Sequence, residues 1–149
     1  MSNSEDNDVF ISEGYQRAYG QWVEITIYAV NASFTVNDAY TRWGKFHKPG
    51  DKNSEVSAKS INGTIIKDGY KYTIASCGRS DASSGTEGGF SLYDGDTLVF
   101  TYYLDCPWGS KNNNDLLDEK DKGGYYVTKD GGNHYGGALG NIFITVMKK

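Results

Sequence analysis

The chain of 149 residues is long enough for one domain, and a domain of this length buries roughly 68–70% of its unfolded surface. Its net charge of −4 and pI near 5.1 argue against nucleic-acid binding and against attraction to strongly anionic membranes, because both depend on clustered Lys and Arg. The 12 Tyr, 6 Phe, 3 Trp and 19 Gly, with only 2 Pro, favour many short strands joined by glycine turns.

The N-terminal segment is acidic and polar. Residues 1–14 contain too little apolar surface to fold, so we predict a flexible acidic arm there and a single domain over residues 15–149. Residues 1–8 do not resemble a signal peptide. No stretch of the sequence approaches the ~20 apolar residues of a membrane-spanning helix.

Alternation of apolar and polar side chains identifies most of the strands. Residues 21–30 place Val23, Ile25 and Ile27 on one face, which is the period of a half-buried strand. The other predicted strands are 32–36, 55–58, 63–66, 70–76, 89–93, 97–104, 125–129 and 141–148. Turn residues separate them, including those at 37–39 and 48–52.

The segment 112–124 differs from the rest of the second half of the chain. It is polar and charged, with Leu116 and Leu117 as its only apolar residues, and we predict an exposed loop there. Strands at the spacing described above, with no convincing long helix, predict an all-β fold. The expected architecture is a single-domain antiparallel β-sandwich.

Two loops carry the most distinctive side chains. The segment 77–86 places Arg79 beside Ser80, and the segment 102–111 places Trp108 close to Lys111. A cation, hydroxyl groups and an aromatic ring together suit a zwitterionic headgroup, in which a phosphate lies beside an amine. The alternative is that both segments are ordinary β-connections with solvated polar residues.

Neither catalysis nor metal binding is indicated. His47 and His134, the histidines of the chain, lie in no recognisable nucleophile motif, and no G-x-S-x-G sequence occurs. Cys77 and Cys106 have no metal-ligand spacing, and they could pair or stay free. We therefore predict no enzyme activity, no metal and no cofactor.

Several segments resemble the aegerolysin family. They are AYGQWV at 18–23, WGK at 43–45, GDK at 50–52, CGRSDA at 77–82, GGFSLYDG at 88–95, DCPWGSK at 105–111 and GGALG at 136–140. They run in family order from about residue 18 to the C-terminus, and the CGRSD and DCPWGSK blocks are long and unusual. The chain is interpreted as a bacterial-type member.

The resemblance implies an actinoporin-like β-sandwich that binds sphingolipid membranes, notably sphingomyelin with cholesterol or ceramide phosphoethanolamine. It implies the receptor-recognising component of a two-component pore-forming cytolysin or insecticidal toxin, in which a larger perforin-like (MACPF) protein inserts the pore and causes hemolysis. Several members lack a conventional signal peptide. We therefore expect secretion or release without one, and action at the target-cell membrane.

The residues expected to contact lipid or face the membrane are Trp22, Trp43, Arg79, Ser80, Asp81, Ser84, Tyr103, Trp108 and Lys111. Each Trp could instead be a core or strand-end aromatic. A large indole suits the membrane interface, because its body is apolar while its N–H stays hydrated.

Two positions depart from the fungal pattern of the family. Ser84 stands where several fungal members carry an acidic residue, with Glu87 nearby, and Leu104 replaces a fungal Trp. The resemblance ties that acid to recognition of cholesterol-bound sphingomyelin. We therefore hypothesise a preference for ceramide phosphoethanolamine, or less selective binding of sphingomyelin.

Two further functions stay open from the sequence. The first is a lectin-like module, in which Trp and Tyr stack on sugars while Asp and Asn bind hydroxyls. The second is a lipid-binding protein without lytic activity. Competition by free sugars would favour the first, and lipid binding without permeabilisation would favour the second.

Overall fold

The computed structural model describes residues 18–109 and 111–149, so the predicted arm at 1–14 lies outside the described residues. The elements are β1 (Trp22–Val30), β2 (Phe34–Trp43), β3 (Lys45–Lys48), β4 (Asp51–Val56), α2 (Ala58–Ile61), β5 (Ile65–Ile66), β6 (Lys71–Cys77), β7 (Thr86–Asp94), β8 (Thr97–Cys106), β9 (Asn114–Glu119), β10 (Tyr125–Gly131) and β11 (Gly140–Lys148). Within these ranges, no helix is long and apolar enough to cross a bilayer.

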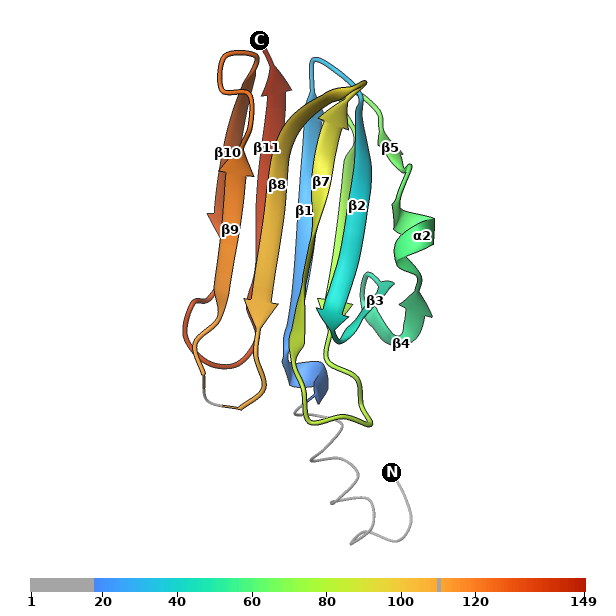
Figure 1. Ribbon diagram of the computed structural model, residues 1–149, viewed down its shortest axis with the longest axis vertical. Coiled ribbons are helices and arrows are strands. Elements are labelled where there is room, and N and C mark those ends of the chain that lie inside the picture. Colours follow the sequence, from blue (N-terminus) through green and yellow to red (C-terminus); the bar gives the residue numbers. More distant parts are fainter. Residues whose placement is uncertain (1–17, 110) are drawn as a thin grey trace, which may run out of the picture.

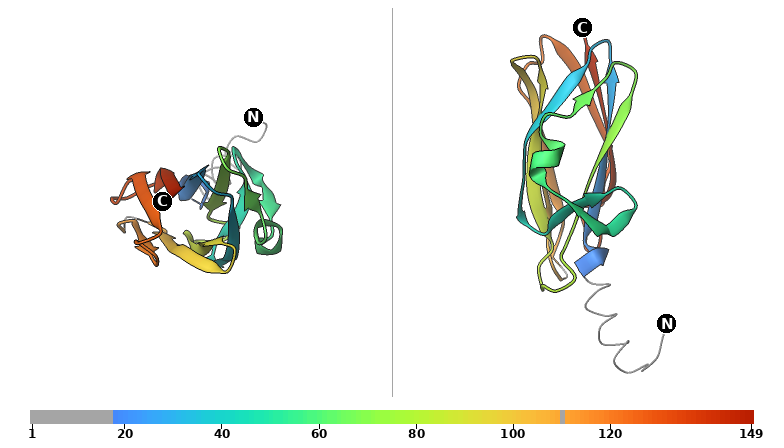
Figure 2. Two further views of the ribbon diagram at one scale, coloured as in Figure 1. Left: turned by 90° about the horizontal axis from the view of Figure 1, so that it is seen from above. Right: turned by 90° about the vertical axis from the view of Figure 1, so that its right-hand side faces the viewer.

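The strands form two sheets that pack face to face (Figures 1 and 2). The first sheet has six strands in the order β10-β11-β1-β6-β3-β4, and the second has five in the order β5-β2-β7-β8-β9. The predicted all-β sandwich is confirmed. β1 pairs with β11 in parallel, whereas its other neighbour, β6, is antiparallel.

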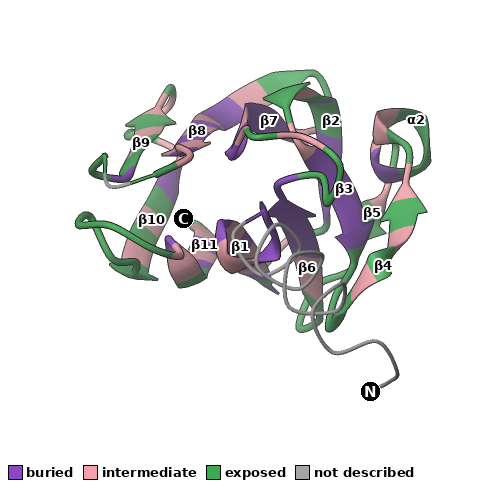
Figure 3. Ribbon diagram, turned by 90° about the horizontal axis from the view of Figure 1, so that it is seen from below, coloured by how far each residue is buried: buried purple, intermediate pink, exposed green. Residues whose placement is uncertain are grey.

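The core lies between the inward faces of the two sheets. Ile25 and Ile27 of β1 are fully buried there, as predicted, and they belong to the same core cluster as aromatic side chains of the second sheet such as Phe90 and Phe100. Burying one such side chain stabilises the fold by about 1.5–3 kcal/mol. Figure 3 shows that buried residues concentrate on the central strands and exposed ones on β4, β9 and β10.

The turn predicted at 37–39 is wrong, because β2 continues through it. The pairing of β2 with β7 shifts register between Asn37 and Tyr40, so the extra residues form an irregularity within the strand. Asp38 takes a positive φ of 56°, a conformation that Asp tolerates better than most residues. The Ala39 N–H donates to the Asn62 side chain at 2.8 Å, which satisfies a backbone group that strand pairing leaves free.

The exposed loop predicted at 112–124 is also wrong over half its length. Residues Asn114–Glu119 form β9, an edge strand that pairs with β8. Its side chains alternate between exposed and half-buried, and Leu117 packs against the core. Charged residues are common on edge strands because they discourage further pairing, and here they concealed the alternation.

Smaller corrections concern the segment 48–66. β4 starts inside the predicted turn at 48–52 and ends before the strand expected at 55–58 would end. The helix α2 follows, with the Ser57 hydroxyl as its N-cap, accepting from the Ser60 N–H at 3.1 Å. The strand predicted at 63–66 is only β5, which pairs with the start of β2.

Several strand ends meet at one end of the sandwich, drawn at the bottom of Figure 1. β1 and β7 begin there, and β2, β6 and β8 end there (Figure 1). The loops that follow β6 and β8 therefore lie at the same end of the molecule. They are the two loops that the sequence singled out.

Candidate functional site

Strand ends and loops at this end enclose a pocket of about 520 Å³, which we call the loop pocket. Its lining residues are Trp43, Ser83, Ser84, Gly85, Thr86, Glu87, Asp105, Pro107, Trp108 and Lys111. Four of the residues selected from the sequence lie here, namely Trp43, Ser84, Trp108 and Lys111. The fold thus brings the two loops together with the end of β2.

Two glycines allow the backbones behind the loop pocket to approach closely. A Cβ on Gly85 would lie 1.9 Å from the carbonyl oxygen of Cys106. Gly44 has a φ of +82°, and a Cβ there would lie 2.5 Å from the carbonyl oxygen of Cys77. Only glycine fits these positions without moving a loop, so the shape of the pocket depends on them.

Three side chains of the pocket come from one row across the second sheet. Trp43 of β2 is the cross-strand partner of Glu87 on β7, and Glu87 is the partner of Asp105 on β8. Successive side chains alternate between the two faces of a sheet. The neighbouring pairs point into the core, so this row points outward into the pocket.

The two carboxylates of this row have different partners. Glu87 accepts a hydrogen bond from the Tyr103 hydroxyl and forms an ion pair with Arg42, with 3.6 Å between Nε and Oε1. The pKa of Asp105 is raised, first by burial and second by the negative charge of Glu87, while Lys111 acts in the opposite direction. The pocket therefore holds a pair of like charges, with the cation Lys111 in its lining and Arg42 beside Glu87.

The two tryptophans of the loop pocket differ in exposure. Trp43 is 57% exposed, so most of its ring is available to a ligand or to a membrane. Trp108 is half-buried and packs against a small cluster made by Ala18, Tyr19 and Cys77. Trp108 is thus a fixed wall of the pocket, whereas Trp43 projects from its rim.

The first loop places three of its four selected residues, Arg79, Ser80 and Asp81, outside the pocket, whereas Ser84 lines it. Arg79 donates two hydrogen bonds of 2.9 Å to the two carboxylate oxygens of Glu55, and this contact raises the pKa of Arg79 and lowers that of Glu55. Ser80 and Asp81 are exposed and do not line the pocket. Tyr103 lies beside it, and its pKa is raised by burial and by the bond to Glu87.

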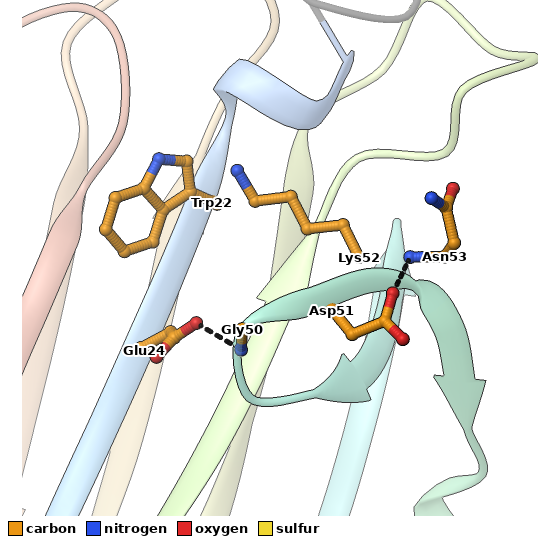
Figure 4. A pocket seen from close by; sticks show the side chains of 6 residues that line it. All are labelled: Trp22, Glu24, Gly50, Asp51, Lys52 and Asn53. Carbon is orange, nitrogen blue, oxygen red and sulfur yellow. Dashed lines mark hydrogen bonds between the residues drawn. The ribbon is translucent and has the colours of Figure 1, made fainter.

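Trp22 lies in a second pocket, of about 430 Å³, between β1 and the turn that joins β3 to β4 (Figure 4). The Lys52 ammonium lies 5.0 Å from the centre of the Trp22 ring and donates to the Tyr19 carbonyl at 2.7 Å. Glu24 accepts from the Gly50 N–H at 3.0 Å. We call this the hairpin pocket, and much of its polar surface is already engaged within the protein.

The two cysteines are free and buried. Burial raises the pKa of each thiol to about 11, so both are protonated at neutral pH. The Cys106 thiol donates to the carbonyl oxygen of Gly137 at 3.4 Å. Both residues support the loops behind the pocket as small apolar side chains.

The histidines lie on separate elements. His47 is buried, with Nδ1 2.7 Å from the carbonyl oxygen of Lys48, and burial lowers its pKa. His134 lies 2.7 Å from Asp115 of β9, with the contact made by its Nε2. In the part of the chain that the structure describes, no group of three or more His, Cys, Asp or Glu side chains could hold a metal ion.

Sequence reasoning missed the carboxylate row of the loop pocket. Glu87 was noted only as a displaced acid, and Asp105 was not selected at all. The available signal was the alternation along 86–94 and 97–106, which puts both residues on the outward face. The register that sets them opposite each other has no signature in the sequence.

Comparisons with known proteins agree with this fold. The family model "Aegerolysin" matches residues 20–149. Asp-hemolysin of Aspergillus fumigatus is 41% identical over 137 residues, which cover 89% of this chain and 96% of that protein. Ostreolysin A6 of Pleurotus ostreatus is 42% identical over 136 residues, which cover 89% of this chain and 98% of that protein.

Solved structures are similar as well. The structure of IP-1A from Alcaligenes faecalis has a TM-score of 0.88 and 66% identity, covering 92% of this chain and 97% of its own. RahU, solved with a TRIS molecule, has a TM-score of 0.84 and 31% identity, covering 89% of this chain and 98% of its own. The family match over most of the chain and the sequence identities to these relatives point to the same family. The chain belongs to the aegerolysin family.

Proposed function

We propose that this protein is the membrane-recognising component of a two-component pore-forming cytolysin, and that it binds sphingolipid headgroups in the loop pocket. The observation that carries the proposal is one pocket containing an exposed indole, a second indole in its wall, a cation and a carboxylate pair. A zwitterionic headgroup needs this combination, because its phosphate and its amine require opposite charges. Family membership supports it, since aegerolysins are lipid-binding, toxin-like proteins.

Lys111 is the phosphate-binding group in this proposal. Its side chain is exposed at the edge of the pocket. A charge-assisted hydrogen bond to phosphate contributes about 1.5–3 kcal/mol. Trp43 is the group that enters the interface, where partial burial of the ring contributes about 1–3 kcal/mol.

The charge of the whole chain supports zwitterionic rather than anionic lipids. A protein with a net charge of −4 is repelled by phosphatidylserine, whereas sphingomyelin and ceramide phosphoethanolamine carry no net charge. With Ser84 at the pocket wall in place of the fungal acid, we propose ceramide phosphoethanolamine or cholesterol-independent sphingomyelin as the lipid.

The lytic part of the proposal involves a second protein. We propose that a perforin-like (MACPF) protein inserts the pore while this chain selects the membrane, giving hemolytic or insecticidal activity. The names of Asp-hemolysin and ostreolysin support lysis as the outcome. We further propose release without a conventional signal peptide and action at the target-cell membrane.

Co-sedimentation with vesicles tests the lipid part. Vesicles of phosphatidylcholine alone are compared with vesicles that also contain ceramide phosphoethanolamine, or sphingomyelin with and without cholesterol. We expect selective binding to a sphingolipid mixture, weakened about 10–100-fold by Lys111→Ala because the phosphate contact is lost. The matched control is Lys122→Ala, an exposed lysine outside the pocket. Equal binding to plain phosphatidylcholine would contradict the proposal.

Dye release tests the lytic part separately. Sphingolipid vesicles loaded with dye are treated with this protein alone and then together with a MACPF protein from the same organism. We expect release only with both proteins. Binding without release under either condition would favour the alternative of a lipid-binding protein that is not lytic.

A further inference from the structure

Two acidic side chains lie opposite each other in the loop pocket. Glu87 and Asp105 are direct cross-strand partners on β7 and β8, and both line the pocket. Directly opposed residues on one face of an antiparallel pair have Cβ atoms about 4.5–5.5 Å apart, and like charges at that spacing destabilise the sheet. Strand pairing alone therefore gives no reason for two acids here.

The position of Glu87 is fixed by its neighbours. Its side chain is only 14% exposed, the Tyr103 hydroxyl donates to it, and Arg42 approaches one oxygen from the solvent side. Asp105 has a raised pKa, because burial and Glu87 both disfavour its charged form. Arg42 reaches Glu87 only at 3.6 Å, and Lys111 does not cancel the rise in the pKa of Asp105, so a cationic group of a ligand would still relieve the repulsion within the pair.

We propose that Glu87 and Asp105 form the cation subsite of the loop pocket, and that it binds the ammonium of a phosphoethanolamine headgroup. Lys111 then binds the phosphate of the same headgroup. This inference rests on the proposed function, since it divides the two ends of the headgroup between two parts of the same pocket. It assigns binding of the ammonium to Glu87 and Asp105 and not to a residue of the first loop.

The chemistry of the pair distinguishes a primary ammonium from a quaternary one. A primary ammonium carries N–H groups that donate to carboxylate oxygens, and such charge-assisted bonds are about twice as strong as neutral ones. The trimethylammonium of phosphocholine has no N–H, so the carboxylates attract it by charge alone, and its remaining contacts are with the rings of Trp43 and Trp108. The pair therefore favours phosphoethanolamine over phosphocholine.

Vesicle binding by charge-removing variants tests the subsite. Glu87→Gln and Asp105→Asn are compared with the wild type on phosphatidylcholine vesicles containing ceramide phosphoethanolamine, sphingomyelin or phosphatidylethanolamine. The control is Asp96→Asn, which removes one charge from the exposed turn at the other end of the same two strands. We expect each pocket variant to lose tenfold or more on ceramide phosphoethanolamine and about twofold or less on sphingomyelin.

Thermal unfolding separates loss of binding from loss of fold. Gln at position 87 can still accept from Tyr103, and removing one charge of the pair removes the repulsion. We therefore expect each variant to melt within a few degrees of the wild type. The phosphatidylethanolamine vesicles show whether the headgroup alone suffices or whether the sphingolipid backbone is also required.

Titration with free headgroups distinguishes failure of this inference from failure of the proposed function. Soluble phosphoethanolamine and phosphocholine are titrated into the protein, and the tryptophan indole N–H signals are followed by NMR. Wild-type binding of phosphoethanolamine that Glu87→Gln weakens supports the subsite, even if no vesicle binds. Equal responses of the wild type and both pocket variants would overturn the subsite, even if the sphingolipid vesicles bind.

Discussion

At the residue scale, Gly85 leaves no space for a side chain. A Cβ there would lie 1.9 Å from the Cys106 carbonyl oxygen, so Gly85→Ala must push the two loops of the pocket apart. We expect this variant to lose about 1–3 kcal/mol of unfolding free energy, as overpacked sites do, and to bind vesicles more weakly. Chemical denaturation measures the first effect. Gly136→Ala is the control, since a Cβ there meets nothing within 4 Å.

Arg79 and Lys111 offer a comparison between two cations of neighbouring loops. Arg79 is engaged in two hydrogen bonds with Glu55, whereas Lys111 lines the loop pocket. We expect Arg79→Ala to change vesicle affinity at most about twofold and stability by less than about 1 kcal/mol, because the ion pair is half-exposed. Co-sedimentation of Arg79→Ala and Lys111→Ala with the same vesicles measures the difference in affinity. A larger loss for Arg79→Ala would place the phosphate on the first loop instead.

At the scale of elements, one buried carboxylate joins the two sheets along an edge. Asp115 of β9 accepts from Lys129 of β10 at 2.7 Å, from the Tyr102 hydroxyl of β8 at 2.7 Å, and meets His134. Its side chain is only 1% exposed. β9 and β10 belong to different sheets, so this contact fastens the edge of the sandwich.

Removing this carboxylate should be costly. Asp115→Asn leaves the partly buried Lys129 ammonium without its anion, and losing a hydrogen bond to a charged partner costs about 1.5–3 kcal/mol. Denaturant unfolding measures the loss. Asp118→Asn, on the same strand but paired with Lys120 at the surface, should change stability by about 0.5 kcal/mol or less.

The same carboxylate predicts a pH dependence. Burial would raise its pKa, but the hydrogen bonds from Lys129, His134 and Tyr102 outweigh burial and lower the pKa below 3.8. The charged form is therefore favoured in the folded state, and its stabilisation is present above pH 3.8 and lost as pH falls through the lowered pKa. The melting temperatures of the wild type and Asp115→Asn, measured as a function of pH, should therefore converge as the pH falls. A difference in melting temperature that does not change with pH would contradict the stabilising role of the Asp115 charge.

Elements also differ in how well the sequence predicted them. β1 was found because its apolar face is continuous from Val23 to Ala29 and packs on the core. β9 was missed because an edge strand needs only one inward apolar side chain, Leu117, and its other inward positions are acidic. Likewise, the composition of the two loops indicated the pocket, but the facing of Glu87 and Asp105 follows from strand register alone.

At the scale of the whole molecule, net charge decides how the protein responds to the surface potential of a membrane. The chain carries −4, so adding phosphatidylserine to vesicles of ceramide phosphoethanolamine should weaken binding through repulsion. Raising the salt concentration should restore binding, because the Debye length falls from about 10 Å at 0.1 M to about 3 Å at 1 M and the repulsion is screened. Co-sedimentation at both salt concentrations tests this. Tighter binding to phosphatidylserine would indicate a basic surface that dominates the net charge.

The parallel pairing of β1 with β11 has a consequence for how the chain is made. β11 lies between β1 and β10, so the last strand described enters the middle of its sheet rather than the edge. During synthesis β1 is made well before β11. The side of β1 that pairs with β11 therefore stays unpaired until β11 has also been made. Contacts between such distant segments form slowly. The sandwich is therefore completed only after β11 has been synthesised, and until then the nascent chain exposes an unpaired apolar strand that favours aggregation or chaperone binding.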